Sequence, residues 1–166
     1  TTTWLWVVVL AFGVINALHS GAWATLGPLV AQDTIGRQGW GYVLSAEAVG
    51  LLLTSIVMLR MPIRRPLLAG MLCTALYGIP VLVIGSRPEL GLLVLAAFIA
   101  GAGIEIFGIG WSLAMQENID ETMLSRAFSY DMLGSLIAVP VGQLAAGPVG
   151  TAFGYQSVQV ASGLAI

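Results

Sequence analysis

The chain has 166 residues and a net charge of −2, with 58% hydrophobic residues, 8% charged residues and no lysine. Soluble domains carry roughly 25% charged residues, so this composition indicates an integral membrane protein with the lipid bilayer as its surroundings. Six scattered arginines form no basic stripe for nucleic acid, and one histidine with one cysteine gives neither a metal-ligand pair nor an internal disulfide, so no metal or cofactor is expected.

Apolar runs separated by short polar turns predict an all-α protein with six membrane helices, each needing about 20 residues. The last run is too short to cross a bilayer, so we expect five full spans and a sixth that is cut short. The predicted spans cover residues 4–31, 40–59, 66–85, 91–115, 131–153 and 155–166, within one transmembrane bundle of residues 1–166.

Polar side chains lie in the middle of the first predicted span. Asn16, His19, Ser20 and Trp23 follow the i, i+3, i+4, i+7 spacing that places residues on one face of a helix. Histidine changes charge near neutral pH, so His19 is a candidate for proton coupling. Asn16 and Trp23 are candidate lining residues of a substrate cavity.

The second span contains Glu47 with Gly50 on the same face, and Glu47 is a second candidate for proton coupling. A strongly basic turn that includes Arg64 and Arg65 follows it, and we expect this turn at the cytoplasmic gate. The third span has no charge, as expected of a helix on the lipid side, and Pro80 is expected to kink it.

The fourth span contains a carboxylate, Glu105, in its apolar interior, at a cost of about 2.5–3.5 kcal/mol. We expect this acid to face a polar interior and to carry protons. One stripe of the helix is small or polar and the opposite face is bulky, which is typical of a helix between protein and lipid. The stripe consists of Gly101, Glu105, Gly108, Ser112 and Gln116, and the bulky face of Ile104, Phe107, Trp111 and Met115.

A polar loop over residues 116–130, part of it interfacial helix, is expected before the fifth span. Arg126 and Asp131 then lie at the cytoplasmic start of that span, where the helix dipole favours an acid. Pro140 and Pro148, together with several glycines, are expected to break the span up.

Loop arginines predict the orientation, because cytoplasmic loops carry an excess of basic residues. Arg60, Arg64, Arg65 and Arg126 belong to alternate loops on one side, whereas Arg37 and Arg87 belong to the other. The loops after the second and fourth spans are therefore predicted to be cytoplasmic, and so is the N-terminus.

Three stretches resemble the C-terminal six-helix half of a major facilitator superfamily transporter, in the bacterial drug-efflux branch with the enterobactin and macrolide exporters. They are GYVLSAEAVGLLL, EIFGIGWSLAMQENI and SRAFSYDMLGSLIAVPVGQLAAGP. The family's basic loop motif G-x-x-x-D-R-x-G-R-R is degraded, since only Arg64 and Arg65 match it, and Arg60 stands in place of its aspartate.

The resemblance implies an inverted repeat of three helices plus three, a partner N-terminal six-helix half and a bacterial cytoplasmic (inner) membrane. It also implies that the first and fourth helices line a central cavity. The sequence has a faint repeat of its own, because acid-x-x-Gly begins at Glu47 in the second span and at Asp131 in the fifth.

These observations predict a secondary active transporter that exports an amphipathic small molecule by alternating access, coupled to protons. The proton-coupling candidates are Glu105, His19 and Glu47, and the cavity candidates are Asn16, Trp23, Phe107, Trp111, Ser112 and Gln116. A channel-like or scaffold membrane subunit is the alternative.

An intramembrane hydrolase is the least favoured reading. Ser112 lies in a partial G-x-S-x-G motif and His19 is its one available base, but the final glycine is absent and the serine is in mid-helix. We therefore expect no enzymatic activity.

Overall fold

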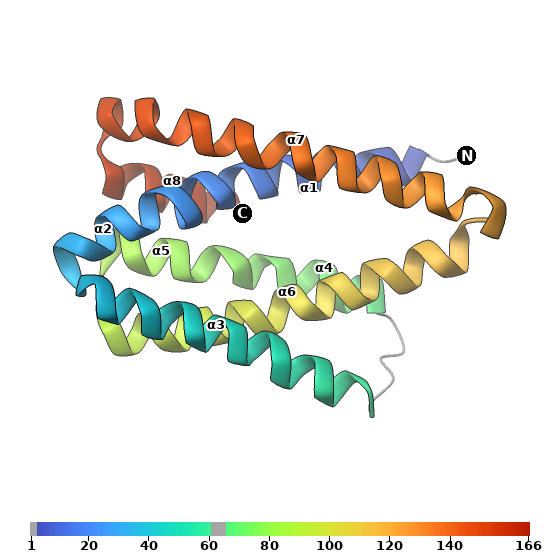
Figure 1. Cartoon of the computed structure of the whole chain (residues 1–166), viewed down its shortest axis with the longest axis horizontal. Helices are drawn as coiled ribbons and strands as arrows, with labels where there is room; N and C mark the ends of the chain where they lie inside the picture. Colours follow the sequence, from blue (N-terminus) through green and yellow to red (C-terminus); the bar gives the residue numbers. More distant parts are fainter. Residues whose placement is uncertain (1–2, 61–65) are drawn as a thin grey trace.

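The computed structural model describes residues 3–60 and 66–166, and the regular elements in these ranges are helical. Among them are five helical runs that are long and apolar enough to cross a membrane: Trp6–Thr34, Gly36–Met58, Leu68–Ser86, Leu90–Asn118 and Glu121–Phe153. Figure 1 shows them lying along the long axis of the molecule, with successive connections at opposite ends. This confirms the predicted all-α class, and the five spans indicate a multi-pass membrane protein.

The first span consists of α1 (Thr3–His19), a π-helical turn η1 (Ser20–Leu26) and α2 (Gly27–Thr34), and the second is α3 (Gly36–Met58). The third consists of α4 (Pro66–Thr74), a 3₁₀ turn η2 (Ala75–Gly78) and α5 (Ile79–Ser86). The fourth and fifth are α6 (Leu90–Asn118) and α7 (Glu121–Phe153), and α8 (Tyr155–Ala165) follows. Gly36 and Gly154 have positive φ angles of 77° and 85°, which glycine adopts without strain, at the turns into α3 and α8.

Proline explains both interruptions of regular α-helix. Pro28 lies in the first turn of α2, directly after η1, and Pro80 lies in the first turn of α5, directly after η2. A proline ring collides with the carbonyl four residues earlier, so the preceding turn changes its hydrogen-bond pattern. Where a kink was predicted at Pro80, the structure has the 3₁₀ turn Ala75–Gly78.

Two predictions about the fifth span are wrong. Helix α7 begins at Glu121, so the expected loop over residues 116–130 reduces to a connection at Ile119 and Asp120. The helix also continues unbroken through Pro140 and Pro148. An acid in the first turn suits the helix dipole. Membrane helices tolerate internal proline where neighbouring groups satisfy the freed backbone carbonyls.

Helices α3 and α6 approach each other closely where glycines meet backbone. A side chain at Gly50 of α3 would collide with the carbonyl oxygen of Phe98, and one at Gly101 of α6 would collide with the carbonyl oxygen of Glu47. Small residues at such crossings let two backbones pack without a layer of side chains between them. The second span is therefore held tightly against the fourth.

The first and fifth spans make the same kind of crossing. A side chain at Gly142 of α7 would collide with the carbonyl oxygen of Ala17, and a Cβ at Gly21 of η1 would lie 2.7 Å from the carbonyl oxygen of Gly142. Figure 1 shows α7 lying along α1 on the side of the bundle opposite α3. Each of α3 and α7 thus packs against one central helix and leaves much of its own surface exposed.

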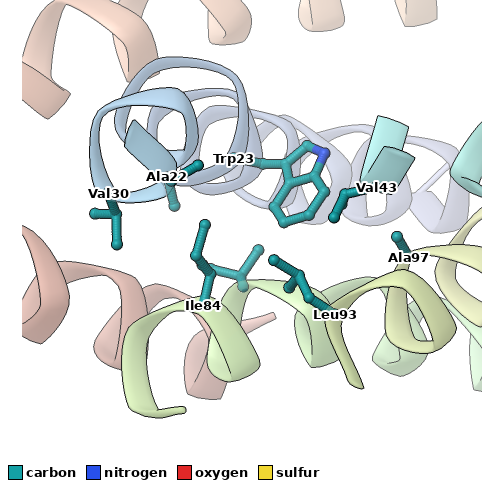
Figure 2. Packing of buried hydrophobic residues seen from close by; sticks show 9 residues of the cluster. Ala22, Trp23, Val30, Val43, Ile84, Leu93 and Ala97 are labelled. Atoms are coloured by element: carbon teal, nitrogen blue, oxygen red, sulfur yellow. The ribbon is translucent and has the colours of Figure 1, made fainter. Parts of the chain in front are cut away.

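A hydrophobic cluster joins the first four spans near the end of the molecule that carries the α2–α3 turn (Figure 2). Its side chains come from η1, α2, α3, α5 and α6 and face one another between these helices. They include Ala22, Trp23, Val30, Val43, Ile84, Leu93 and Ala97. The cluster fixes the position of Trp23, whose indole nitrogen takes part in the candidate site.

Candidate functional site

Two carboxylates inside the spans accept a hydrogen bond from a tryptophan. Trp23 Nε1 of η1 donates to Glu47 Oε2 of α3 at 3.0 Å, and Trp111 Nε1 of α6 donates to Asp131 Oδ2 of α7 at 3.1 Å. Each bond joins a span to the next span in sequence, the first to the second and the fourth to the fifth. An indole N–H offers a donor on an apolar body, which suits a carboxylate in apolar surroundings.

Asp131 does not lie at the start of a helix, which corrects its predicted place. Because α7 begins at Glu121, Asp131 is about 15 Å along the helix at 1.5 Å per residue. The helix dipole therefore does not explain this acid. Arg126 is exposed on the same helix, and Arg64 and Arg65, the other predicted gate residues, lie outside the described residues.

A cavity of about 130 Å³ lies beside Asp131, between α1, η2, α6 and α7. Its polar walls include Asn16, whose side-chain nitrogen donates to Ser135 Oγ at 3.2 Å. Its apolar wall includes Phe12, Phe107 and Trp111. Of the predicted cavity candidates, Asn16, Phe107 and Trp111 are thus brought together here, whereas Trp23 belongs to the hydrophobic cluster.

His19 is buried with its ring stacked on Tyr77, at a centroid distance of 3.5 Å and an interplanar angle of 12°. Its Nε2 has no hydrogen-bond partner among the residues that the structure describes. Tyr77 also lines the cavity beside Asp131. Sequence reasoning missed Tyr77, because the third span was assigned to the lipid side on its lack of charge.

Glu105 lies on a different side of α6, in an open groove of about 490 Å³. The groove is lined by much of the predicted polar stripe, including Gly108, Ser112 and Gln116. Ser55 Oγ of α3 donates a hydrogen bond of 2.5 Å to Glu105 Oε1. The stripe was predicted, but Ser55 was not, since nothing in the sequence relates the end of the second span to this acid.

The bulky face of α6 packs inside the bundle, which is where the cavity candidates Phe107 and Trp111 were expected. Phe107 and Trp111 are only 7% and 6% exposed, and Met115 is fully buried. Phe107 stacks on Phe12 of α1 with ring centroids 3.9 Å apart. Gly108 and Gln116 of the polar stripe are exposed, whereas Gly101 is buried against α3.

Ser112 and His19, the pair weighed for a hydrolase, lie in different surroundings. Ser112 lines the open groove with Glu105, whereas His19 is buried against Tyr77 and lies 6.1 Å from Trp23 by ring centroids. The groups that the structure does assemble are hydrogen-bonded carboxylates and aromatic rings. These can bind cations or exchange protons.

Comparisons of the chain with protein-family models, with curated proteins and with solved structures give no match.

Proposed function

We propose that this chain is one six-helix half of a secondary active transporter of the major facilitator type, in a bacterial cytoplasmic membrane. The observation that carries the proposal is a twofold repetition in the packing. The second span crosses the fourth at Gly50 and Gly101, and the fifth crosses the first at Gly142 and Gly21. If spans one to three correspond to spans four to six, each crossing is the counterpart of the other, as in an inverted 3+3 repeat.

The carboxylates repeat in the same way. Glu47 of the second span accepts from a tryptophan of the first, and Asp131 of the fifth accepts from a tryptophan of the fourth. Glu47 and Asp131 are also the two acids of the acid-x-x-Gly match in the sequence. A contact and a sequence signal that repeat together support a duplicated three-helix unit more strongly than either does alone.

The groove beside Glu105 supports the proposed place of a second bundle. Glu105, Ser112 and Gln116 line it on the outward side of α6. Facing lipid, this polar strip would be costly, whereas facing a water-filled path between two bundles it is satisfied. Alternating access then moves the two bundles against each other around a central site.

The substrate in this proposal is an amphipathic small molecule that is exported in exchange for protons. Aromatic side chains such as Phe107 and Trp111 provide apolar contact area, and Glu105 provides a group that gains and loses a proton. The described arginines Arg37, Arg60, Arg87 and Arg126 lie at or near helix ends, so they are poorly placed to bind an anionic metabolite in mid-membrane.

Transport assays in proteoliposomes test the proposal. A monomer of this chain is expected to give no uphill accumulation of an amphipathic fluorescent dye under a pH gradient, because one bundle alone cannot alternate access. Together with a partner bundle, it is expected to give saturable, proton-driven accumulation. Proton-coupled flux from a verified monomer contradicts the proposal, steady ion currents favour a channel, and labelling of Ser112 by a fluorophosphonate favours a hydrolase.

A further inference from the structure

We propose that the cavity beside Asp131 binds a small ammonium group. The cavity is formed by α1, η2, α6 and α7 of this chain alone, so the inference goes beyond the proposed transport function and does not depend on a second bundle. Three properties of its walls support an ammonium ligand: an acid without a cationic partner, a set of aromatic rings, and neutral oxygen acceptors.

The first property is the unbalanced charge of Asp131. Its hydrogen bond comes from Trp111, a neutral donor, and no ion pair joins an acidic to a basic side chain within residues 3–60 and 66–166. A carboxylate in apolar surroundings is costly unless a positive charge compensates it. A bound ammonium supplies that charge.

The second property is the aromatic wall. Phe12 and Phe107 are stacked, and Phe107 and Trp111 are nearly parallel, with centroids 6.3 Å apart and planes 15° apart. Tyr77 completes the wall from the third span. Aromatic rings attract cations within about 6 Å of their centroids, and they do so best where water is excluded, as in the aromatic cages that hold quaternary ammonium groups.

The third property is the set of neutral oxygen acceptors, which is large enough to accept hydrogen bonds from an ammonium group but too small to coordinate a metal ion. Asn16 uses its side-chain nitrogen to donate to Ser135, so its amide oxygen is the atom that can accept from an N–H or polarised C–H group. Calcium takes six to eight oxygen ligands, and the described residues contain no group of three His, Cys, Asp or Glu side chains that could hold a metal ion. The mixture of one acid and several rings favours an organic cation.

Choline and its uncharged carbon analogue 3,3-dimethylbutan-1-ol provide a matched pair of probes, because they differ in charge and hardly in shape. Calorimetry on the purified full chain in detergent is expected to show choline binding, with the neutral analogue at least about tenfold weaker. Asp131→Asn keeps an acceptor for Trp111 but removes the charge, and is expected to weaken choline binding by at least about tenfold. Glu117→Gln, an equal change of charge at an exposed position of α6, is expected to leave it unchanged.

A second measurement needs no variant, so it holds even if Asp131→Asn fails to fold. A hydrophobic carbodiimide modifies carboxyl groups within membranes, and the modified residues are identified by mass spectrometry. Choline is expected to protect Asp131 and to leave modification of Glu105 unchanged. The proposal is overturned if choline protects neither acid, if the neutral analogue binds equally well, or if sodium displaces choline at equal concentration. None of these results depends on transport, so a failure here is distinct from a failure of the transporter proposal.

Discussion

At the scale of residues, the three acids inside the spans, all partly exposed, are held in the same way. Glu47, Asp131 and Glu105 each accept a hydrogen bond from a neutral side chain on a neighbouring span. The donors are two indoles and one hydroxyl, and no ion pair involves these acids in the part of the chain that the structure describes. An acid held by a neutral donor remains able to take a proton or to attract a cation.

The contact between Trp23 and Glu47 is expected to show energetic coupling. In a double-mutant cycle with Trp23→Phe and Glu47→Ala, the interaction energy should be about 0.6 kcal/mol and at most about 1.7 kcal/mol, the mean and the maximum measured for hydrogen bonds between membrane helices. Unfolding in mixed detergent micelles provides the free energies. Strictly additive effects of the two changes would show that the hydrogen bond contributes nothing.

The sequence predicted which residues matter here better than it predicted their partners. Glu47, Asp131, Trp23 and Trp111 were all identified as candidates, but no sequence spacing relates an indole to a particular acid. Tyr77 was missed because an uncharged apolar span looks the same whether it faces lipid or protein.

At the scale of elements, helical periodicity showed which side chains of α6 share a face but not which face meets the protein interior. In a soluble protein, the apolar face is the buried face. In a membrane, lipid and protein interior are both apolar, so the pattern does not distinguish them. The stacking of Phe107 on Phe12 settles the assignment, since it places the bulky face against α1.

The close crossing of α3 and α6 is expected to be intolerant of added volume. A Cβ at Gly50 collides with backbone of α6, so Gly50→Ala should lower the free energy of unfolding by about 1–3 kcal/mol. Gly41, on the same helix, has nothing within 4 Å of an added Cβ. Gly41→Ala is therefore the matched control and should leave stability unchanged or raise it by about 0.5–1 kcal/mol. Equal effects of the two substitutions would contradict the packing described for this crossing.

The early start of α7 predicts a helical pattern of accessibility before residue 131. In a Cys73→Ala background, single cysteines at Ser125, Arg126 and Ser129 should react quickly with a polar maleimide, because these positions are exposed. Ala127 is only 7% exposed, and its cysteine variant should react at least about tenfold more slowly. Equally fast labelling at all four positions would instead support the loop over residues 116–130 that the sequence predicted.

At the scale of the whole molecule, the ends of the spans agree with the predicted distribution of arginines. Arg60 and Arg126 belong to the end that carries the α6–α7 connection, and Arg37 and Arg87 belong to the opposite end (Figure 1). The overall topology was predictable because span length and composition determine it. The repeated close crossings, of α3 with α6 and of α7 with α1, could not be predicted. They depend on which glycine contacts which backbone, and the sequence does not show this.

Helix α6 faces two sites, the groove beside Glu105 and the cavity beside Asp131, with different sides. Glu105 faces the open groove, where a second bundle would lie, and Trp111 with Asp131 faces the cavity inside this bundle. The position of Glu105 makes it the candidate for proton coupling, since that groove is the surface that would open and close to water.

The proposed role of Glu105 in proton coupling is tested by measuring uphill export when this chain, carrying Glu105→Gln, is combined with a partner bundle. Glutamine keeps the shape and accepts the hydrogen bond from Ser55, but it cannot titrate. Proton-driven accumulation in membrane vesicles is expected to be lost while substrate exchange without a gradient persists, and Glu117→Gln is expected to behave as the parent. Uphill export by Glu105→Gln at the parental rate, with the parental pH dependence, would contradict this role.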